Sequence, residues 1–408
     1  MNSTGEAAAP GLHVFLVAGE ESGDRLGAAL MAALQENTGG HVDFSGVGGT
    51  HMAAQGLRSL FPLGDKAFMG IAAIPANLPR ILRRIAGTAD AAVAARPDVL
   101  VIIDNPEFTH RVARRVRKRG PAIPIVDYVC PSVWAWRPGR ARAMRGYVDH
   151  VLALLPFEPT AMRQLGGPAC SYVGHPLTER VGALRPGDEE ARRRLADPPL
   201  LLVLPGSRAG EIRRLASEFG AAVKLLIERA GPVDVVVPTV PALADTVRAA
   251  VKLWRLPAQV VTDPAEKDAA FRKARAALTK SGTSTLELAL AGVPMVAGYK
   301  VSLLEEVVAR YLIQVPSVIL ANLILGENVV PEFLQRDCIG EKLAAALLPL
   351  LSDTPERRRQ VEAFGRLDRL MEIGSARPSE RAAALVLACA GRQIQPERET
   401  VDYRLPTA

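Results

Sequence analysis

The chain is poor in cysteine, and its cysteines show no pairing pattern. Four occur in 408 residues, and none belongs to a C-x-x-C pair: Cys130, Cys170, Cys338 and Cys389. This scarcity excludes a scaffold built on disulfides and a zinc site built on cysteine motifs. We therefore expect four reduced thiols, as in a cytosolic protein.

Long apolar runs and an export signal are also missing. No uninterrupted stretch of about 18 apolar residues occurs, so no segment is expected to span a membrane. Residues 1–10 contain no charged segment followed by an apolar core. They are not expected to be a signal peptide but a disordered tail, and the location expected for the protein is the cytoplasm.

A strong excess of charge of one sign is absent as well. The 50 basic and 43 acidic side chains leave a net charge of +7, and only 5% of the residues are aromatic. No basic stretch interleaved with aromatics is present, so nucleic acid is not an expected partner. The small positive excess instead suits phosphorylated substrates or an anionic lipid surface.

What the chain does contain is a regular alternation of β-branched apolar runs with amphipathic segments. Continuous apolar runs bounded by loops predict strands that are buried on both faces of a parallel sheet. The expected strands cover 13–18, 42–47, 99–103, 123–129, 151–155 and 171–173 in the first half, and 200–204, 233–237, 259–262, 276–279 and 294–298 in the second.

This pattern predicts an α/β protein with two doubly wound, Rossmann-like domains facing each other across a cleft. The charged stretch 180–199 contains Pro and Gly and is interpreted as the linker. We expect an N-terminal domain over 11–185 and a C-terminal domain over 195–375. Residues 376–408 are expected to form a helix and tail that return, by analogy with such architectures, to the first domain.

Two turns in the second half have the composition of a sugar-nucleotide site. Ser281-Gly282-Thr283 stands between a strand and a helix expected over 284–291, where exposed backbone N–H groups suit a phosphate. Glu287, one turn into that helix, is placed to reach ribose hydroxyls. Upstream, Pro205-Gly206-Ser207-Arg208 ends another strand, and its guanidinium suits a diphosphate without any metal. Either motif alone also fits an ordinary strand-to-helix turn.

Two loops in the first half carry carboxylates at strand ends. Asp104, after the strand 99–103, is the candidate general base. The alternative is an N-cap or a turn carboxylate held by Asn105. Residues 19–24 include Glu20 and Ser22 but lack the dinucleotide fingerprint, so a nicotinamide cofactor is not expected. Their alternative role is a capping loop in which Ser22 or Asp24 caps the following helix.

Two of the three tryptophans fall two residues apart in Cys130-Pro-Ser-Val-Trp-Ala-Trp-Arg137. In an extended segment Trp134 and Trp136 would share one face. They would then form a platform for a sugar ring or acyl chain, with Arg137 available to a phosphate. Core packing is the alternative. His175, after the last strand of the first half, is interpreted as a structural residue, with a hinge or substrate contact as the other reading.

Residues 69–85 combine an apolar stripe with a basic flank. The stripe comprises Ile71, Ile74, Leu78, Ile81, Leu82 and Ile85, and the flank comprises Arg80, Arg83 and Arg84. A stripe at this spacing is usually core. The basic flank and the prolines also fit a helix that lies on an anionic membrane.

Together these motifs resemble those of the bacterial lipid-A-disaccharide synthase family, inverting glycosyltransferases of the GT-B type. The resemblance extends over residues 12 to 390 and is carried by Gly19–Asp24, Met69–Ile71, Ile103–Pro106, Pro131–Arg137, Leu155–Glu158, Gly174–Pro176, Pro205–Arg208, Ser281–Glu287 and Asn322–Ile324. It implies transfer from UDP-2,3-diacylglucosamine to 2,3-diacylglucosamine 1-phosphate, forming a β-1,6-linked disaccharide and UDP.

The resemblance also implies roles for single residues. Asp104 would be the base, while Ser207, Arg208, the Ser281 turn, Glu287 and Asn322 would form the UDP site. Glu20, Ser22, Trp134, Trp136, Arg137 and His175 would belong to the acceptor side. Asn105, Glu107 and Thr109 depart from the family's pattern and leave the orientation of Asp104 open.

The expected partners are the two acylated substrates and the inner face of the cytoplasmic membrane, contacted through residues 71–85. No Asp-x-Asp motif lies near the diphosphate motifs, so no metal and no cofactor is expected. The oligomeric state, a homodimer included, stays open. Two other hypotheses remain: a UDP-sugar 2-epimerase and a non-catalytic protein that binds sugar nucleotides.

Overall fold

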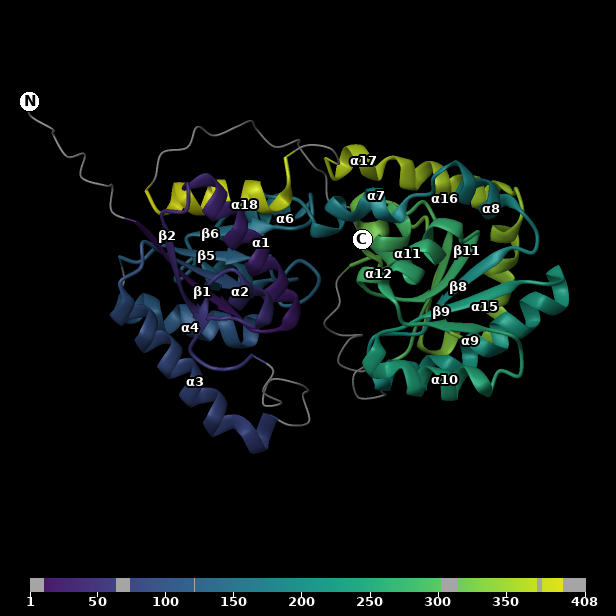
Figure 1. Cartoon of the computed structure of the whole chain (residues 1–408), viewed down its shortest axis with the longest axis horizontal. Helices are drawn as coiled ribbons and strands as arrows, with labels where there is room; N and C mark the ends of the chain where they lie inside the picture. The colour runs from purple at the N-terminus through teal and green to yellow at the C-terminus, as the bar shows by residue number, and fades with distance from the viewer. Residues whose placement is uncertain (1–10, 64–73, 121, 302–314, 373–375, 392–408) are drawn as a thin grey trace, which may run out of the picture. The chain divides into compact units, whose positions relative to one another are not determined.

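The computed structural model describes residues 11–63, 74–120, 122–301, 315–372 and 376–391. These residues form two compact units (Figure 1). Unit 1 contains the described residues up to Pro176 together with those from 376 onward, and unit 2 contains those from Leu177 to 372. The expected tail 1–10 and the C-terminal tail from 392 lie outside the described residues.

Unit 1 is built on a seven-stranded parallel sheet with the order β3-β2-β1-β4-β5-β6-β7. Its central strands are buried on both faces because helices cover each side. Residues of α1 and α18 pack on one face, and residues of α3 and α4 on the other. The strands are β1 Leu12–Ala18, β2 Val42–Val47, β3 Arg58–Ser59, β4 Val99–Ile103, β5 Ile125–Tyr128, β6 His150–Ala153 and β7 Ala169–Tyr172.

The helices of unit 1 follow from the connections between these strands. Each parallel pair needs a crossover, and the amphipathic segments between the apolar runs supply it. They are α1 Glu21–Asn37, α2 Thr50–Ala54, α3 Ile74–Ala95, α4 Pro106–Arg119, α5 Gly139–Met144, α6 Glu158–Gln164 and, from the end of the chain, α18 Pro378–Cys389.

Unit 2 repeats the plan with a six-stranded parallel sheet in the order β10-β9-β8-β11-β12-β13. The strands are β8 Leu200–Leu204, β9 Asp234–Pro238, β10 Gln259–Val261, β11 Ala276–Lys280, β12 Met295–Tyr299 and β13 Glu332–Leu334. The α-helices are α7 Val181–Leu184, α8 Asp188–Leu195, α9 Ala209–Ala230, α10 Ala244–Lys252, α11 Pro264–Lys273, α12 Thr283–Leu290, α14 Leu320–Leu325, α15 Gly340–Leu347, α16 Pro355–Gly365 and α17 Leu367–Leu370.

The last described helix, α18, completes the core of unit 1. Ala383, Val386 and Leu387 are buried in the same apolar cluster as Leu30 and Leu34 of α1. An ion pair of 2.9 Å between Arg377 and Glu36 ties the start of α18 to α1. One face of the first sheet is therefore covered partly by the end of the chain.

The boundary between the units differs from the sequence-based expectation. Residues 177–185 were assigned to the first domain and 180–199 to a linker, but η3 Pro176–Arg180, α7 and α8 belong to unit 2 apart from Pro176. Polar contacts explain the difference. Arg180 pairs with Asp268 at 2.8 Å, and Arg185 Nε donates to the Leu290 carbonyl at 3.1 Å. The charges that suggested a solvated linker are the groups that hold this segment to unit 2.

Candidate active site

The strand register of each sheet brings two motif-bearing loops together. In unit 1, β1 pairs with β4 and Ala18 lies opposite Ile103, so the loop containing Ser22 and the loop containing Asp104 leave adjacent strand ends. In unit 2, β8 pairs with β11 and Leu204 lies opposite Thr279. Strand order reverses at both pairs, which is where ligands bind in open α/β sheets.

Asp104 is held by one hydrogen bond to each carboxylate oxygen. Ser22 Oγ donates to Oδ2 at 2.7 Å, and the Asn105 backbone N–H donates to Oδ1 at 2.7 Å. Asp104 is half-buried and its backbone adopts a positive φ of 54°. The carboxylate is therefore fixed in direction, while each oxygen keeps a further lone pair for another donor.

The residues that depart from the family's pattern hold the backbone around Asp104. Asn105 Nδ2 donates to Glu20 Oε1 at 3.1 Å, which joins the two loops a second time. Thr109 Oγ1 donates to the Asp104 carbonyl at 2.7 Å. Gly19 is required by close approach, because a Cβ there would lie 2.5 Å from Asn105 Cβ. These contacts therefore fix the backbone that orients Asp104.

The capping role considered for Ser22 and Asp24 is not what the structure shows. The N-cap of α1 is Glu20, and no side chain caps that helix. Ser22 instead donates to Asp104, and buried Asp24 accepts N–H bonds from Gly49 at 2.7 Å, His51 at 2.9 Å and Met52 at 3.0 Å. Asp24 therefore caps the neighbouring α2, since its carboxylate reaches across from α1.

A small cavity of about 170 Å³ lies beside Asp104. Its walls come from the loops after β4 and β5 and from the start of α5, and they comprise Asp104, Pro106, Val129, Cys130, Pro131, Ser132, Val133, Trp136, Arg137 and Arg140. Arg137 places its guanidinium 4.5 Å from the centre of the Trp136 ring. The cavity thus combines a carboxylate with an aromatic face and two guanidinium groups.

The expected platform of two tryptophans sharing one face is wrong. The segment is a turn, not an extended strand, because the N–H groups of Ala135 and Trp136 both donate to the Ser132 carbonyl. Trp136 lines the Asp104 cavity, whereas Trp134 packs edge-on against Phe157 with ring centres 4.9 Å apart. The two rings therefore have different surroundings: Trp136 lines the cavity, and Trp134 contacts Phe157 and Glu158.

Glu158 anchors this turn from the interior. It is buried, and it accepts hydrogen bonds from Trp134 Nε1 at 3.1 Å and from the Leu155 N–H at 2.9 Å. Burial raises the pKa of Glu158 to about 7. No site role was predicted for Glu158, because the Trp134–Glu158 contact depends on how β5 and β6 bring the two loops together.

Half-buried His175 lies just before the end of unit 1. Burial lowers its pKa to about 4, so it is neutral at pH 7.

The second site is a cavity of about 260 Å³ within unit 2. Ser207, Thr283 and Glu287, three of the residues predicted for the nucleotide site, line it. Glu287 is nearly buried and accepts hydrogen bonds from Lys267 Nζ at 3.0 and 3.1 Å and from Arg180 at 3.2 Å. The remaining lining residues are Leu204, Gly206, Pro238, Thr239, Val240, Lys267, Lys280 and Ser284.

Buried Glu211 organises the turn at Arg208. Its Oε2 accepts the N–H groups of Ser207 at 2.9 Å and Arg208 at 3.2 Å, and its Oε1 accepts from Lys280 at 3.2 Å. Gly206 has a φ of 139°, and a Cβ there would lie 2.7 Å from Glu211 Cβ. The Arg208 side chain is 77% exposed, and its guanidinium lies 3.5 Å from Glu211 Oε1. Sequence reasoning missed Glu211, Lys267 and Lys280, although Lys280 directly precedes the Ser281 motif.

Four residues expected in the nucleotide site do not line this cavity: Arg208, Ser281, Gly282 and Asn322. Ser281 Oγ donates to the Val318 carbonyl at 2.9 Å. The Asn322 amide, on α14, is buried, and it donates to Ser317 and Val330 and accepts from Val329 and Val330. Both side chains therefore hold the segment 317–330, which contains α14, in place. Gly282, with a φ of 143°, is the N-cap that starts α12 at Thr283.

Two general features concern the part of the chain that the structure describes. It contains no group of three or more His, Cys, Asp or Glu side chains arranged to hold a metal ion. None of its helices combines the length and apolarity that crossing a bilayer requires.

Comparison with known proteins gives close relatives and a shared fold. Residues 14–386 match the family model for lipid-A-disaccharide synthetase. The lipid-A-disaccharide synthase of Nitrobacter winogradskyi is 60% identical over 93% of this chain and 96% of its own. That of Nitrobacter hamburgensis is 59% identical over 96% of this chain and 99% of its own.

Among solved structures, a putative UDP-N-acetylglucosamine 2-epimerase from Listeria monocytogenes superposes with a TM-score of 0.62 and covers 96% of this chain and 100% of its own. At 13% identity this match shows a shared fold alone. It establishes two Rossmann-like domains of the GT-B type, and it does not favour an epimerase.

The raised pKa of Glu158 predicts a pH-dependent loss of stability. Between about pH 4.5 and 7 the unfolded chain ionises this carboxyl while the folded chain keeps it protonated, so the free energy of unfolding falls as pH rises. The full penalty, roughly 3 kcal/mol, is present above pH 7. Urea unfolding at pH 5 and pH 8 should show that the wild type loses free energy of unfolding relative to Glu158→Gln as the pH rises. Equal pH dependence of the unfolding free energy in both proteins would contradict this prediction. The lowered pKa of His175 shifts stability with pH in the opposite direction, but by the same amount in both proteins.

Proposed function

The chain belongs to the lipid-A-disaccharide synthetase family, and we propose that it transfers 2,3-diacylglucosamine from UDP-2,3-diacylglucosamine to the 6-hydroxyl of 2,3-diacylglucosamine 1-phosphate. The anomeric carbon is inverted, and the products are a β-1,6-linked disaccharide 1-phosphate and UDP. The observation that best supports this chemistry is the carboxylate of Asp104, fixed by Ser22 and Asn105 at the edge of a cavity.

Asp104 acts as the general base in this proposal. As the acceptor oxygen forms a bond to the anomeric carbon, its proton moves to the Asp104 carboxylate, and the bond to the UDP oxygen breaks on the opposite face. The hydrogen bonds from Ser22 and Asn105 keep the carboxylate aimed, because each holds one of its two oxygens. Trp136 and Arg137 contact the acceptor in the same cavity.

The leaving UDP is held by the cavity of unit 2. Lys280 and Lys267, which line the cavity, and the exposed Arg208 next to Ser207 supply positive charge. The N-terminus of α12 directs backbone N–H groups toward a phosphate. Charge that develops on the diphosphate as the bond breaks is stabilised by these groups, an effect typically worth several kcal/mol in enzymes. Glu287 is the acceptor for ribose hydroxyls.

We also propose that the protein attaches peripherally to the inner face of the cytoplasmic membrane through α3. The apolar stripe of this helix divides in two. Ile81 is partly buried and Ile85 is buried in the core of unit 1, whereas Leu78 and Leu82 are each 40% exposed. Ile71 lies outside the described residues. Exposed leucines beside Arg80 and Arg83 suit an acylated, anionic surface.

Asp104→Asn should lower turnover about 100-fold or more, because amide nitrogen and oxygen cannot accept the proton. UDP release from UDP-2,3-diacylglucosamine, with and without the lipid acceptor and in EDTA, measures this step. Release that depends on the acceptor supports transfer; release without it would point to hydrolysis or epimerisation. The control is Asp43→Asn at an exposed position, which should retain full turnover. UDP affinity should be unchanged in both variants.

Lys280→Met should weaken UDP binding about 10- to 100-fold, because a charge-assisted hydrogen bond to phosphate is lost. Calorimetric titration with UDP measures the change, and thermal unfolding checks that Glu211 tolerates the loss of its partner. Lys280→Arg should restore most of the affinity. The matched control is Lys342→Met, an exposed lysine of the same unit. Unchanged affinity in a folded Lys280→Met protein would remove Lys280 from the site.

Replacing Leu78 and Leu82 together by Ser should reduce binding to anionic vesicles about tenfold or more, because their apolar area no longer enters the bilayer. Vesicle sedimentation measures the bound fraction. Leu334→Ser with Ile339→Ser removes comparable exposed apolar area from unit 2 and should have no effect. Unfolding of the Leu78/Leu82 variant would show instead that these side chains are core.

A further inference from the structure

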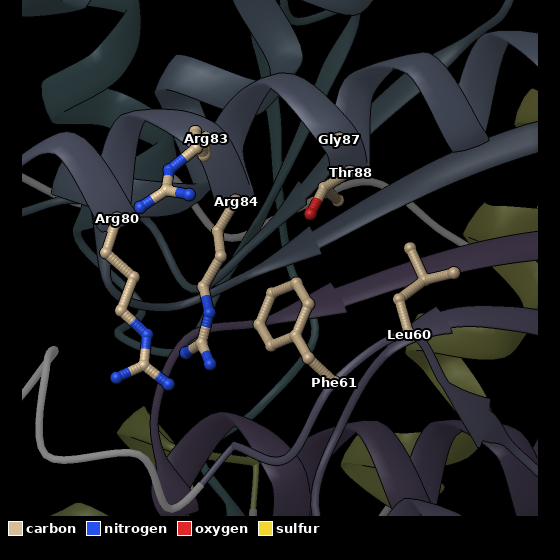
Figure 2. Close-up of a pocket in the computed structure, with 7 residues that line it drawn as sticks. All are labelled: Leu60, Phe61, Arg80, Arg83, Arg84, Gly87 and Thr88. Carbon is tan, nitrogen blue, oxygen red and sulfur yellow. The ribbon is translucent and has the colours of Figure 1, made fainter.

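A second cavity in unit 1, of about 560 Å³, lies between α3 and the segment that follows β3 (Figure 2). It is separate in composition from the Asp104 cavity, because the two share no lining residue. Its walls are Leu60, Phe61, Arg80, Arg83, Arg84, Gly87 and Thr88. The α3 residues that line it span about two helical turns.

The cavity carries a concentrated positive charge. Three of its seven lining residues are arginines and none is acidic. Figure 2 shows the long side chains of Arg80 and Arg84 extending from α3 along the same side. The Arg84 guanidinium lies 4.5 Å from the centre of the Phe61 ring, which fixes its plane. Planar guanidinium groups that are held in this way bind phosphate oxygens in a bidentate manner.

Thr88 gives this cavity a feature that the folded chain alone does not explain. The residue is 1% exposed, and its Oγ has no hydrogen-bond partner among the described residues. In Figure 2 the hydroxyl points from α3 toward the Phe61 side of the cavity. A buried hydroxyl without a partner is costly, and a ligand oxygen in the cavity would remove that cost.

The opposite wall is apolar. Leu60 is 49% exposed, and the Phe61 ring packs edge-on against Phe108 at the start of α4, with ring centres 6.4 Å apart. The cavity therefore offers an anion site with a hydrocarbon surface directly beside it.

We propose that this cavity binds the phosphate of an acylated phosphate ester. The guanidinium groups of Arg80, Arg83 and Arg84 contact the phosphate oxygens, Thr88 Oγ donates to one of them, and the first part of an acyl chain lies against Leu60 and Phe61. The proposal rests on the proposed function, in which acylated substrates are taken from a membrane. Two sources carry this chemistry: a phospholipid headgroup and the 1-phosphate of the lipid acceptor.

Thr88→Val is the sharpest test, because it removes the hydroxyl and keeps the shape of the side chain. Binding is measured by calorimetry on the full chain without any UDP-sugar, so its result does not depend on turnover. The probes are inorganic phosphate, monomeric dihexanoyl phosphatidylglycerol, and 2,3-diacylglucosamine 1-phosphate with its dephosphorylated form. We expect about tenfold weaker binding of at least one acylated phosphate. The thermal unfolding midpoint should stay the same or rise.

A triple variant tests the charge. Arg80→Gln, Arg83→Gln and Arg84→Gln together should weaken binding of the same acylated phosphate on the order of 100-fold. The matched control removes three exposed arginines elsewhere in unit 1, Arg119→Gln, Arg145→Gln and Arg163→Gln, and should bind as the wild type does. An equal loss in the control would overturn the pocket in favour of diffuse electrostatic attraction.

The probes also distinguish the two sources. A loss confined to phosphatidylglycerol identifies a headgroup site, and a loss confined to the phosphorylated acceptor identifies a substrate site. The proposal is wrong if Thr88→Val binds every probe as the wild type does, or if inorganic phosphate binds as tightly as the acylated esters. A failed transfer assay with these binding losses intact would overturn the proposed reaction but not this site.

Discussion

The parallel pairing of β1 with β4 and of β8 with β11 is the constraint on which both sites depend. Ala18 opposite Ile103 places Ser22 within reach of Asp104, and Leu204 opposite Thr279 places the Ser207 turn beside Lys280. A slip of one residue would turn every side chain of a strand to the other face. Burial of these strands on both sides makes such a slip prohibitively costly, so the core fixes the chemistry that follows the strand ends.

The loops after β4 and β5 store backbone strain at the Asp104 cavity. Asp104, Val129 and Arg137 all line it and have φ values of 54°, 91° and 58°. Each such conformation costs roughly 1–3 kcal/mol, most for β-branched Val129. Hydrogen bonds to neighbouring strands hold two of these residues in place: the Asp104 N–H donates to the Tyr128 carbonyl, and the Val129 N–H donates to the Leu152 carbonyl. The result is a cavity whose shape is set before any ligand arrives.

The sequence allowed prediction of what depends on local pattern. Three strands, 42–47, 99–103 and 200–204, match in full, and the last two are continuous apolar runs. The two-residue β3 and the edge strand β13 have no such pattern and were missed. The tryptophan pair failed for a related reason: period-two reasoning assumes an extended chain, and this segment turns. Glu211, Lys267 and Lys280 became recognisable only through their partners. The orphaned hydroxyl of Thr88 depends on tertiary packing alone.

The cavity proposed for the nucleotide shows why its basic residues were harder to predict from the sequence than its turns. Lys280 is paired with Glu211, and Lys267 and Arg180 with Glu287, so the charges alternate across one small, largely buried space. Each of these cations therefore has a carboxylate partner in the folded chain. A diphosphate that enters the cavity exchanges one anionic partner for another, so little new desolvation of the lysines is required. The same carboxylates repel weakly held anions, and only a ligand that also satisfies Glu287 with donors of its own gains the full benefit. A ribose attached to a diphosphate offers that combination, whereas inorganic phosphate does not.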